Sequence, residues 1–284
     1  MKATLALFLL AGGVSLSAQA GSRQLGTGGA SEIEGSAGGG IVPWAVIAGY
    51  GTEGEYAATA FATRVHTDDY RLGVFGAAVG LNNRVELSVA SQELDLVTLG
   101  PALGMPGASI RQDVFGAKVR LYGDVLYSRG PQLSLGVQYK RNKDFLIPSL
   151  VGAEDDSGVD VYLAATKVFL AGVGGYNGFI NGTLRSTRAN ETGLLGFGGD
   201  GKSGRSLQAE VSAGVFLNRR IAIGFDFRQK PNNLSAISED DWADAFIAWF
   251  PNRHVSVVAA YADLGSVGTL PGQRGWYLSV QGAF

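Results

Sequence analysis

The sequence lacks cysteine altogether, so a disulfide-stapled exported scaffold is excluded. It also lacks an excess of one charge: 23 basic and 25 acidic residues are interspersed and give a net charge of −2. No basic surface for nucleic acid is therefore expected. Proline is sparse at 8 residues, whereas glycine is abundant at 43. Because so much glycine weakens helices and suits strands with tight turns, the composition predicts an all-β fold.

Long hydrophobic runs are missing as well. The N-terminal residues have one early cation (Lys2), a short apolar core from Leu5 to Leu10 and a small-residue motif ending at Ala20. This is the pattern of a secretory signal peptide, so we expect residues 1–20 to be a signal peptide and residues 21–284 the exported domain. After residue 20, no apolar run approaches the roughly 18 residues that a transmembrane helix requires. The exported chain is then either a soluble periplasmic protein or a closed transmembrane barrel.

The hydrophobic periodicity favours the barrel. In NRVELSVASQ, Val85, Leu87 and Val89 share one strand face, whereas Glu86 and Gln92 share the other. The same alternation recurs in stretches of about 10 to 13 residues. Such stretches match tilted transmembrane strands and exceed the roughly 5 to 6 residues of strands in soluble sheets.

The connections and the aromatic residues point the same way. Short turns at 81–84, 217–220 and 250–254 alternate with long polar or glycine-rich connections. Outer-membrane barrels have short periplasmic turns and long external loops, which assigns the short turns to the periplasm. Eight aromatic residues near segment ends are predicted to form interfacial girdles: Trp44, Tyr50, Tyr56, Tyr70, Trp242, Trp249, Phe250 and Trp276.

The strand count follows from the segments and their parity. Alternating segments occur near 42–50, 55–66, 69–80, 83–95, 109–122, 132–143, 157–169, 178–188, 205–217, 219–230, 241–250, 253–264 and 274–284. Bacterial single-chain barrels have an even number of strands, and the turn assignment requires one more strand before residue 42, for which residues 24–35 are the candidate. We predict an antiparallel up-and-down transmembrane β-barrel of 14 strands. The alternative is a barrel of 12 strands, with residues 21–50 plugging the lumen or lying in the periplasm.

Several stretches of the sequence resemble a known family. EIEGSAGGGIVPWAVIAGYG (32–51), TDDYRLGVFGAAVGL (67–81), ETGLLGFGGDG (191–201), KPNNLSAISEDDWADAFIAW (230–249) and RGWYLSVQGAF (274–284) are similar to segments of an uncharacterised proteobacterial family of outer-membrane proteins, domain of unknown function 3034. The resemblance extends over essentially the whole exported chain. It implies a location in the bacterial outer membrane and brings no activity, substrate or catalytic residue.

The polar strand faces are predicted to line the lumen. Their candidate pore residues carry both signs of charge: Arg84, Glu86, Gln92, Lys118, Arg120, Gln138, Lys140, Arg185, Gln208, Glu210, Asp226, Arg228, Asp244 and Gln281. They predict either a water-filled pore with opposed charged walls or a closed interior in which the same residues pair. A lumen of 14 strands is wider than the 8-strand barrel that side chains can fill, which favours the pore unless residues 21–41 or a long loop plug it.

Two external features have chemical alternatives. His66, Asp68 and Asp69 form a turn that could activate water in a hydrolase, with a second acidic group from residues 239–241. The plainer interpretation is an Asx-type turn. The acidic clusters 153–158 and 238–244 are interpreted as solvated loop charge rather than as a cation bridge to lipopolysaccharide phosphate, because they lack the ligand spacing of a calcium loop.

The functional prediction is a porin-like channel or facilitator for small polar solutes, without enzyme activity, metal or cofactor. The alternatives are a structural or adhesive barrel without a pore and an outer-membrane hydrolase using the His66 turn. Expected partners are membrane lipid, lipopolysaccharide and a small solute. The terminal run GWYLSVQGAF is predicted to be the strand that closes the barrel by pairing with the first strand. Its last residue, Phe284, resembles the aromatic signal read by the barrel-assembly machinery.

Overall fold

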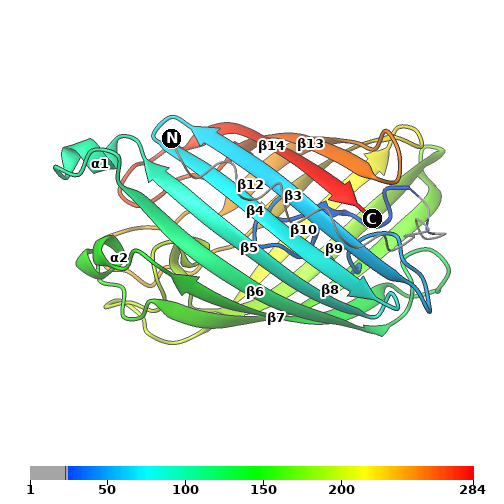
Figure 1. Cartoon of the computed structure of the whole chain (residues 1–284), viewed down its shortest axis with the longest axis horizontal. Helices are drawn as coiled ribbons and strands as arrows, with labels where there is room; N and C mark the ends of the chain where they lie inside the picture. The colour runs from blue at the N-terminus through cyan, green and yellow to red at the C-terminus, as the bar shows by residue number, and fades with distance from the viewer. Residues whose placement is uncertain (1–22, 24) are drawn as a thin grey trace, which may run out of the picture.

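The protein forms a closed antiparallel β-barrel with a segment of its own chain inside (Figure 1). The computed structural model describes residue 23 and residues 25–284; the predicted signal peptide lies outside this part. Each strand pairs with its neighbour in sequence, and β14 pairs with β3 to close the ring. No edge strand remains in the barrel, so every strand is paired on both sides.

The barrel has 12 strands. They are β3 (Tyr56–Thr67), β4 (Tyr70–Leu81), β5 (Val85–Leu96), β6 (Ser109–Tyr122), β7 (Gln132–Asn142), β8 (Ser157–Val173), β9 (Tyr176–Thr187), β10 (Ser206–Phe216), β11 (Ile221–Arg228), β12 (Trp242–Trp249), β13 (Val255–Asp263) and β14 (Arg274–Ala283). They confirm the 12 predicted segments from 55–66 onward. The prediction of 14 strands is wrong, and the 12-strand alternative is confirmed.

The two N-terminal segments predicted as spanning strands lie inside the lumen. The described part of the first segment, residues 25–35, and residues 42–50 belong to a folded plug, which we define as residues 25–50. The plug contains only the two-residue strands β1 (Ala30–Ser31) and β2 (Ala37–Gly38), which pair with each other. The plug enters and leaves the lumen at the same, short-turn end of the barrel. The chain therefore reaches the start of β3 without two further spanning strands.

The outer face of the barrel is apolar. Side chains such as Phe75, Leu87, Phe115, Leu184 and Ile247 point outward, each about half exposed. Between them, the inward residues alternate along every strand, as in the burial pattern of β5. An apolar band of this kind is stable in contact with lipid, which identifies the barrel as membrane-spanning.

The aromatic girdle prediction is only partly correct. Tyr56, Trp249 and Trp276 are outward and exposed. The other five aromatic residues are buried inside the barrel: Trp44, Tyr50, Tyr70, Trp242 and Phe250. Trp44 and Tyr50 belong to the N-terminal segment inside the lumen. Tyr70, Trp242 and Phe250 face this segment or the loops, which give them apolar partners.

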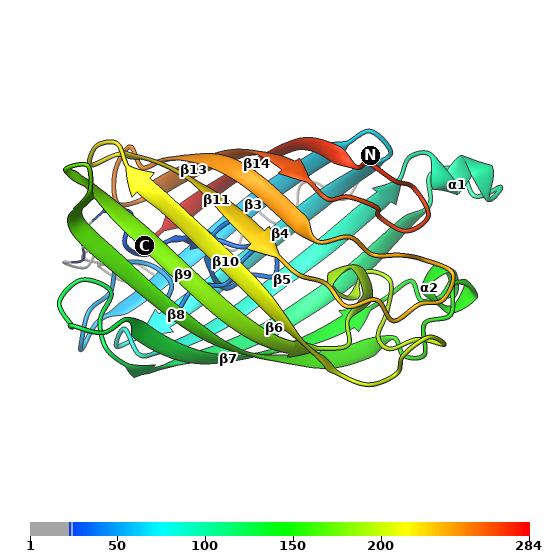
Figure 2. The same cartoon turned by 180° about the vertical axis from the view of Figure 1, so that it is seen from behind.

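The two ends of the barrel differ. One end has mostly short connections, whereas the other carries most of the long loops, with α1 (Leu99–Ala102), α2 (Leu146–Leu150) and η1 (Asn190–Gly193) (Figure 2). Among the described residues, no helix is long and apolar enough to cross a membrane. At the short-turn end, the backbone of Phe284 pairs with Ala58 on β3, and the Phe284 side chain is 61% exposed.

Candidate functional site in the barrel lumen

The plug owes its shape to a tight acidic turn and to glycine. The amide of Glu32 donates to the carbonyl of Ser36, and the amide of Gly35 donates to the carbonyl of Glu32. Gly35 has a φ of 102°, a left-handed conformation that glycine adopts without strain. A Cβ on Gly39 would lie 2.4 Å from a carboxylate oxygen of Asp226, so the plug backbone approaches the wall closely there. The glycine content of this segment therefore serves packing in the lumen.

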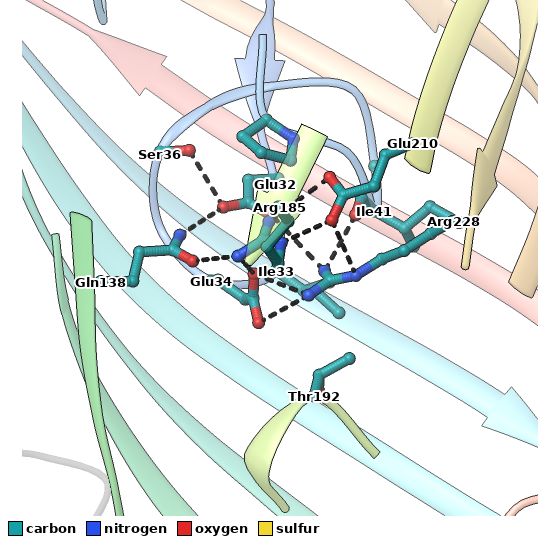
Figure 3. Close-up of polar contacts among 12 residues, drawn as sticks. Glu32, Ile33, Glu34, Ser36, Ile41, Gln138, Arg185, Thr192, Glu210 and Arg228 are labelled. Atoms are coloured by element: carbon teal, nitrogen blue, oxygen red, sulfur yellow. Dashed lines mark hydrogen bonds and ion pairs between the residues drawn. The ribbon is translucent and has the colours of Figure 1, made fainter. Parts of the chain in front are cut away.

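The Glu34 carboxylate at the tip of this turn is surrounded by three cations of the wall, of which Figure 3 labels Arg185 and Arg228. It forms an ion pair with Lys140 of β7. Arg228 of β11 donates to both Glu34 oxygens, at 3.0 and 3.1 Å, and Arg185 of β9 lies 3.3 Å from Glu34 Oε2. All four side chains are buried. Breaking such a desolvated set would leave uncompensated charge in the lumen.

Neighbouring wall groups hold the three cations in place. Asp160 Oδ2 lies 2.7 Å from Lys140 Nζ. Glu210 is an ion-pair partner of Arg185, and it lies 3.5 Å from Arg228 Nε. The strands thus present the cations on a rigid, charge-paired surface.

Glu32, the other acidic residue of the turn, has a different environment. Its Oε1 accepts hydrogen bonds from Ser36 Oγ and from Gln138 Nε2, both at 2.9 Å. Arg228 Nη1 lies 4.0 Å from Glu32 Oε2. Glu32 is therefore held mainly by neutral donors and Glu34 by charged ones.

A second charged contact anchors the part of the plug that follows Gly35. Glu86 of β5 and Lys118 of β6 form an ion pair at 3.0 Å. Glu86 accepts from the amides of Ala37 and Ala48, and Lys118 donates to the carbonyls of Ala37 and Trp44. One wall ion pair thus provides hydrogen-bond partners for four backbone groups of the plug.

Two carboxylates, Asp226 and Asp244, lie opposite each other on β11 and β12. Asp226 accepts from the amide of Gly40 at 2.7 Å. Both Asp244 oxygens are buried without a hydrogen-bond partner in the described part of the chain. This is the least satisfied region of the polar wall.

The β9–β10 loop closes the lumen from the long-loop end. We define residues 188–199 of this loop as the cap. The carbonyl of Thr192 accepts from Lys140 and Gln112, and the carbonyl of Leu194 accepts from Asn142. Between plug and cap lies an apolar cavity of 40 Å³, lined by residues such as Ile33 and Leu194. The long connections were predicted to be external, but residues 189–199 of the β9–β10 connection are buried in the barrel.

The cap carries backbone strain and a buried acidic pair. Glu191 and Thr192 have φ values of 43° and 62°, which non-glycine residues rarely adopt. Lys230 lies 2.6 Å from Glu191 and 3.7 Å from Glu239, and Glu239 accepts from the amide of Glu191. Burial, followed by the charge of Glu191, raises the pKa of Glu239 to about 8. Burial also raises the pKa of Glu191, against the lowering effect of Lys230.

The predicted lumen residues fall into three groups. Arg84 is exposed in the β4–β5 turn, so its assignment to the lumen is wrong. Arg120 and Gln208 are half-buried. The others are buried inside the barrel: Glu86, Gln92, Lys118, Gln138, Lys140, Arg185, Glu210, Asp226, Arg228, Asp244 and Gln281.

Sequence reasoning missed the plug's own contribution. Glu32 and Glu34 were assigned to a spanning strand at 24–35. Pro43 argues against a central strand in the following apolar run, 42–50. Asp160 and Gln112 were also missed. Both follow the inward alternation of their strands and could have been found from it.

The residues of the hydrolase alternative do not come together. His66 is exposed on the outer face of β3. Asp69 accepts hydrogen bonds from Thr98 and Gln273, which tie neighbouring loops together. Glu239 is buried in the cap cluster. Among the described residues, no group of three or more His, Cys, Asp or Glu could hold a metal ion.

Comparison with known proteins identifies a family and a fold. Residues 27–281 match the family described as "Protein of unknown function (DUF3034)", and the chain belongs to this family. No curated protein matches the chain. A structure of the KdgM porin is similar, with a TM-score of 0.50, 7% identity, and coverage of 80% of this chain and 99% of that one. A NanC porin structure is similar, with a TM-score of 0.50, 8% identity, and coverage of 79% and 98%. The shared feature is the outer-membrane barrel fold, which together with the apolar outer face assigns the protein to the bacterial outer membrane.

Proposed function

We propose that this family member is a channel for small polar solutes and that the structure is its closed state. A barrel of 12 strands is wider than one that wall side chains alone can fill. Here the plug and the cap fill the remaining space. When the plug moves out, the lumen offers a mixed-charge passage whose walls include Lys118, Lys140, Glu210 and Asp226.

One observation carries the proposal: the plug is not part of the barrel's hydrogen-bonded ladder. Its strands β1 and β2 pair with each other, and the barrel is closed without them. The polar contacts between the described plug and the wall involve side chains, such as Trp44 Nε1 donating to Ser212 Oγ at 2.8 Å. The plug can therefore leave without opening any strand pair of the barrel.

The test locks the plug with a disulfide in a chain that has no other cysteine. A Cβ on Gly39 lies 2.9 Å from Asp226 Cγ, so cysteines at 39 and 226 are within disulfide reach. The variant Gly39→Cys/Asp226→Cys is reconstituted in a planar bilayer. We expect no current when it is oxidised and stepwise conductance after reduction.

The single variants Gly39→Cys and Asp226→Cys are the controls and should not respond to reduction. If the reduced double variant remains silent at every voltage and salt concentration, the channel proposal is wrong. The filled lumen favours, as second candidate, a structural barrel without a pore, and that candidate predicts this silence.

A further inference from the structure

The environment of Glu34 has the form of a ligand site. Its two carboxylate oxygens are bound differently: Oε1 contacts Lys140 and Arg228, whereas Oε2 contacts Arg185 and Arg228. A planar anion with two oxygens matches this set of donors, because Arg228 can address both oxygens at once. A spherical ion such as chloride can occupy only one of the two positions.

The local charge balance at this place favours an anion. Lys140, Arg185 and Arg228 face two wall carboxylates, Asp160 and Glu210, so this group of five wall residues has one positive charge in excess. Glu34 of the plug supplies the missing negative charge. Without it, an unpaired cation would remain in a buried region, at a high cost in free energy.

The three cations stay in place when the plug leaves. They lie on β7, β9 and β11, whose backbones are paired in the barrel. Arg185 also donates to Gln138 Oε1 at 2.6 Å, and Asp160 and Glu210 remain as positioning groups. The site is therefore a property of the wall rather than of the plug.

We propose that Lys140, Arg185 and Arg228 form a carboxylate-binding site in the barrel wall, occupied by Glu34 in the closed state and by the carboxylate of a small anionic solute in the open state. The inference rests on the proposed channel function and adds its substrate class. Glu34 acts as a built-in competitor, so a solute carboxylate and the plug exclude each other at this position.

The first experiment tests binding without conduction. Glu34→Ala removes atoms equivalent to one acetate ion and leaves the three cations intact. We expect 100 mM acetate to raise the midpoint of heat denaturation of the full-length variant by about 3–5 °C over chloride at equal ionic strength. The midpoint is measured from the loss of the folded band on a denaturing gel. The same measurement in phosphate at equal ionic strength distinguishes a carboxylate site from a general anion site.

Two variants serve as matched controls. Glu32→Ala removes the neighbouring carboxylate, whose donors are mainly neutral, and should show no specific effect of acetate. Glu34→Gln fills the space with an amide and should not respond either. Equal midpoints of Glu34→Ala in acetate and chloride would overturn the carboxylate site, and an effect of phosphate equal to that of acetate would reduce it to a general anion site and overturn the stated substrate class.

The second experiment uses the reduced Gly39→Cys/Asp226→Cys channel and separates the two proposals. Millimolar acetate should lower its chloride current at least ~2-fold, and adding Lys140→Met should abolish this effect. Current that is insensitive to acetate would overturn the carboxylate site and leave the channel standing. A silent barrel combined with acetate rescue of Glu34→Ala would overturn the channel and leave the site as a structural anion site.

Discussion

The plug and the cap fill the same lumen from opposite ends, but they are stabilised differently. The plug is held by complementary charges, with Glu34 among three cations and with Lys118 and Glu86 satisfying its backbone. The cap contains two consecutive left-handed residues, and its Glu191 shares Lys230 with a second carboxylate, Glu239 of the β11–β12 connection. The difference indicates that the plug is held more strongly in the lumen than the cap.

Removing Arg185 should have the largest effect on stability, because Glu34, Asp160 and Glu210 would all lose a buried ion-pair partner. We expect Arg185→Met to lower the free energy of unfolding by about 3–5 kcal/mol. Urea unfolding in lipid vesicles, followed by tryptophan fluorescence, measures it. Arg141→Met changes an exposed arginine of β7 and should stay within about 0.5 kcal/mol of the wild type. Similar losses for the two variants would contradict the charge-based account of the plug.

The cap should loosen as the pH rises. The pKa of Glu239 is raised to about 8, so the protonated form stabilises the cap, and this stabilisation is lost as the pH rises through 8. Ionised Glu239 then faces ionised Glu191 with only Lys230 between them, while Asp240 adds further negative charge. Trypsin cleavage at Lys202, next to the cap, should accelerate several-fold between pH 6.5 and 9, after correction with a peptide substrate.

Glu239→Gln is the matched control for this pH response. It keeps the shape of the side chain and removes the titration, so the cleavage rate should become nearly independent of pH. A wild-type rate that does not change across this range would contradict the role of Glu239 in the cap.

Relieving the cap strain should have the smallest effect. Thr192 is a β-branched residue at a φ of 62°, and its hydroxyl is buried without a hydrogen-bond partner in the described chain. Thr192→Gly should stabilise the protein by about 0.5–1 kcal/mol, because the relief of strain exceeds the added entropy of the unfolded chain. The urea midpoint measures the gain. Thr187→Gly, in the extended β9, should be destabilising; a loss of stability in both variants would show that Thr192 is not strained.

The strands were predictable from the sequence, because lipid on one side and a polar interior on the other impose a period of two. Every spanning strand from Tyr56 onward was found, and the inward direction of Glu86, Lys140 and Arg228 followed from the same parity. Arg84 was misplaced because the alternation continues into the turn, where it no longer fixes direction.

The plug and the cap were not predictable in the same way. The apolar run at 42–50 resembles a spanning strand because burial inside the barrel selects apolar residues, as contact with lipid does. Which wall residue binds Glu34 depends on how the plug folds back at Gly35, and no local periodicity encodes this. The burial of the cap loop depends on partners such as Asn142 and Lys230, which are distant in sequence.

The position of the plug also bears on the order of folding. The plug ends at residue 50, a few residues before β3, and β3 pairs with the last strand, β14. The plug is thus connected directly to the strand at the closing seam of the barrel. Because the plug shares no strand pairing with the barrel, the ring can close by pairing β3 with β14 without waiting for the plug. A weakened plug should therefore lower the stability of the folded protein without slowing closure of the ring.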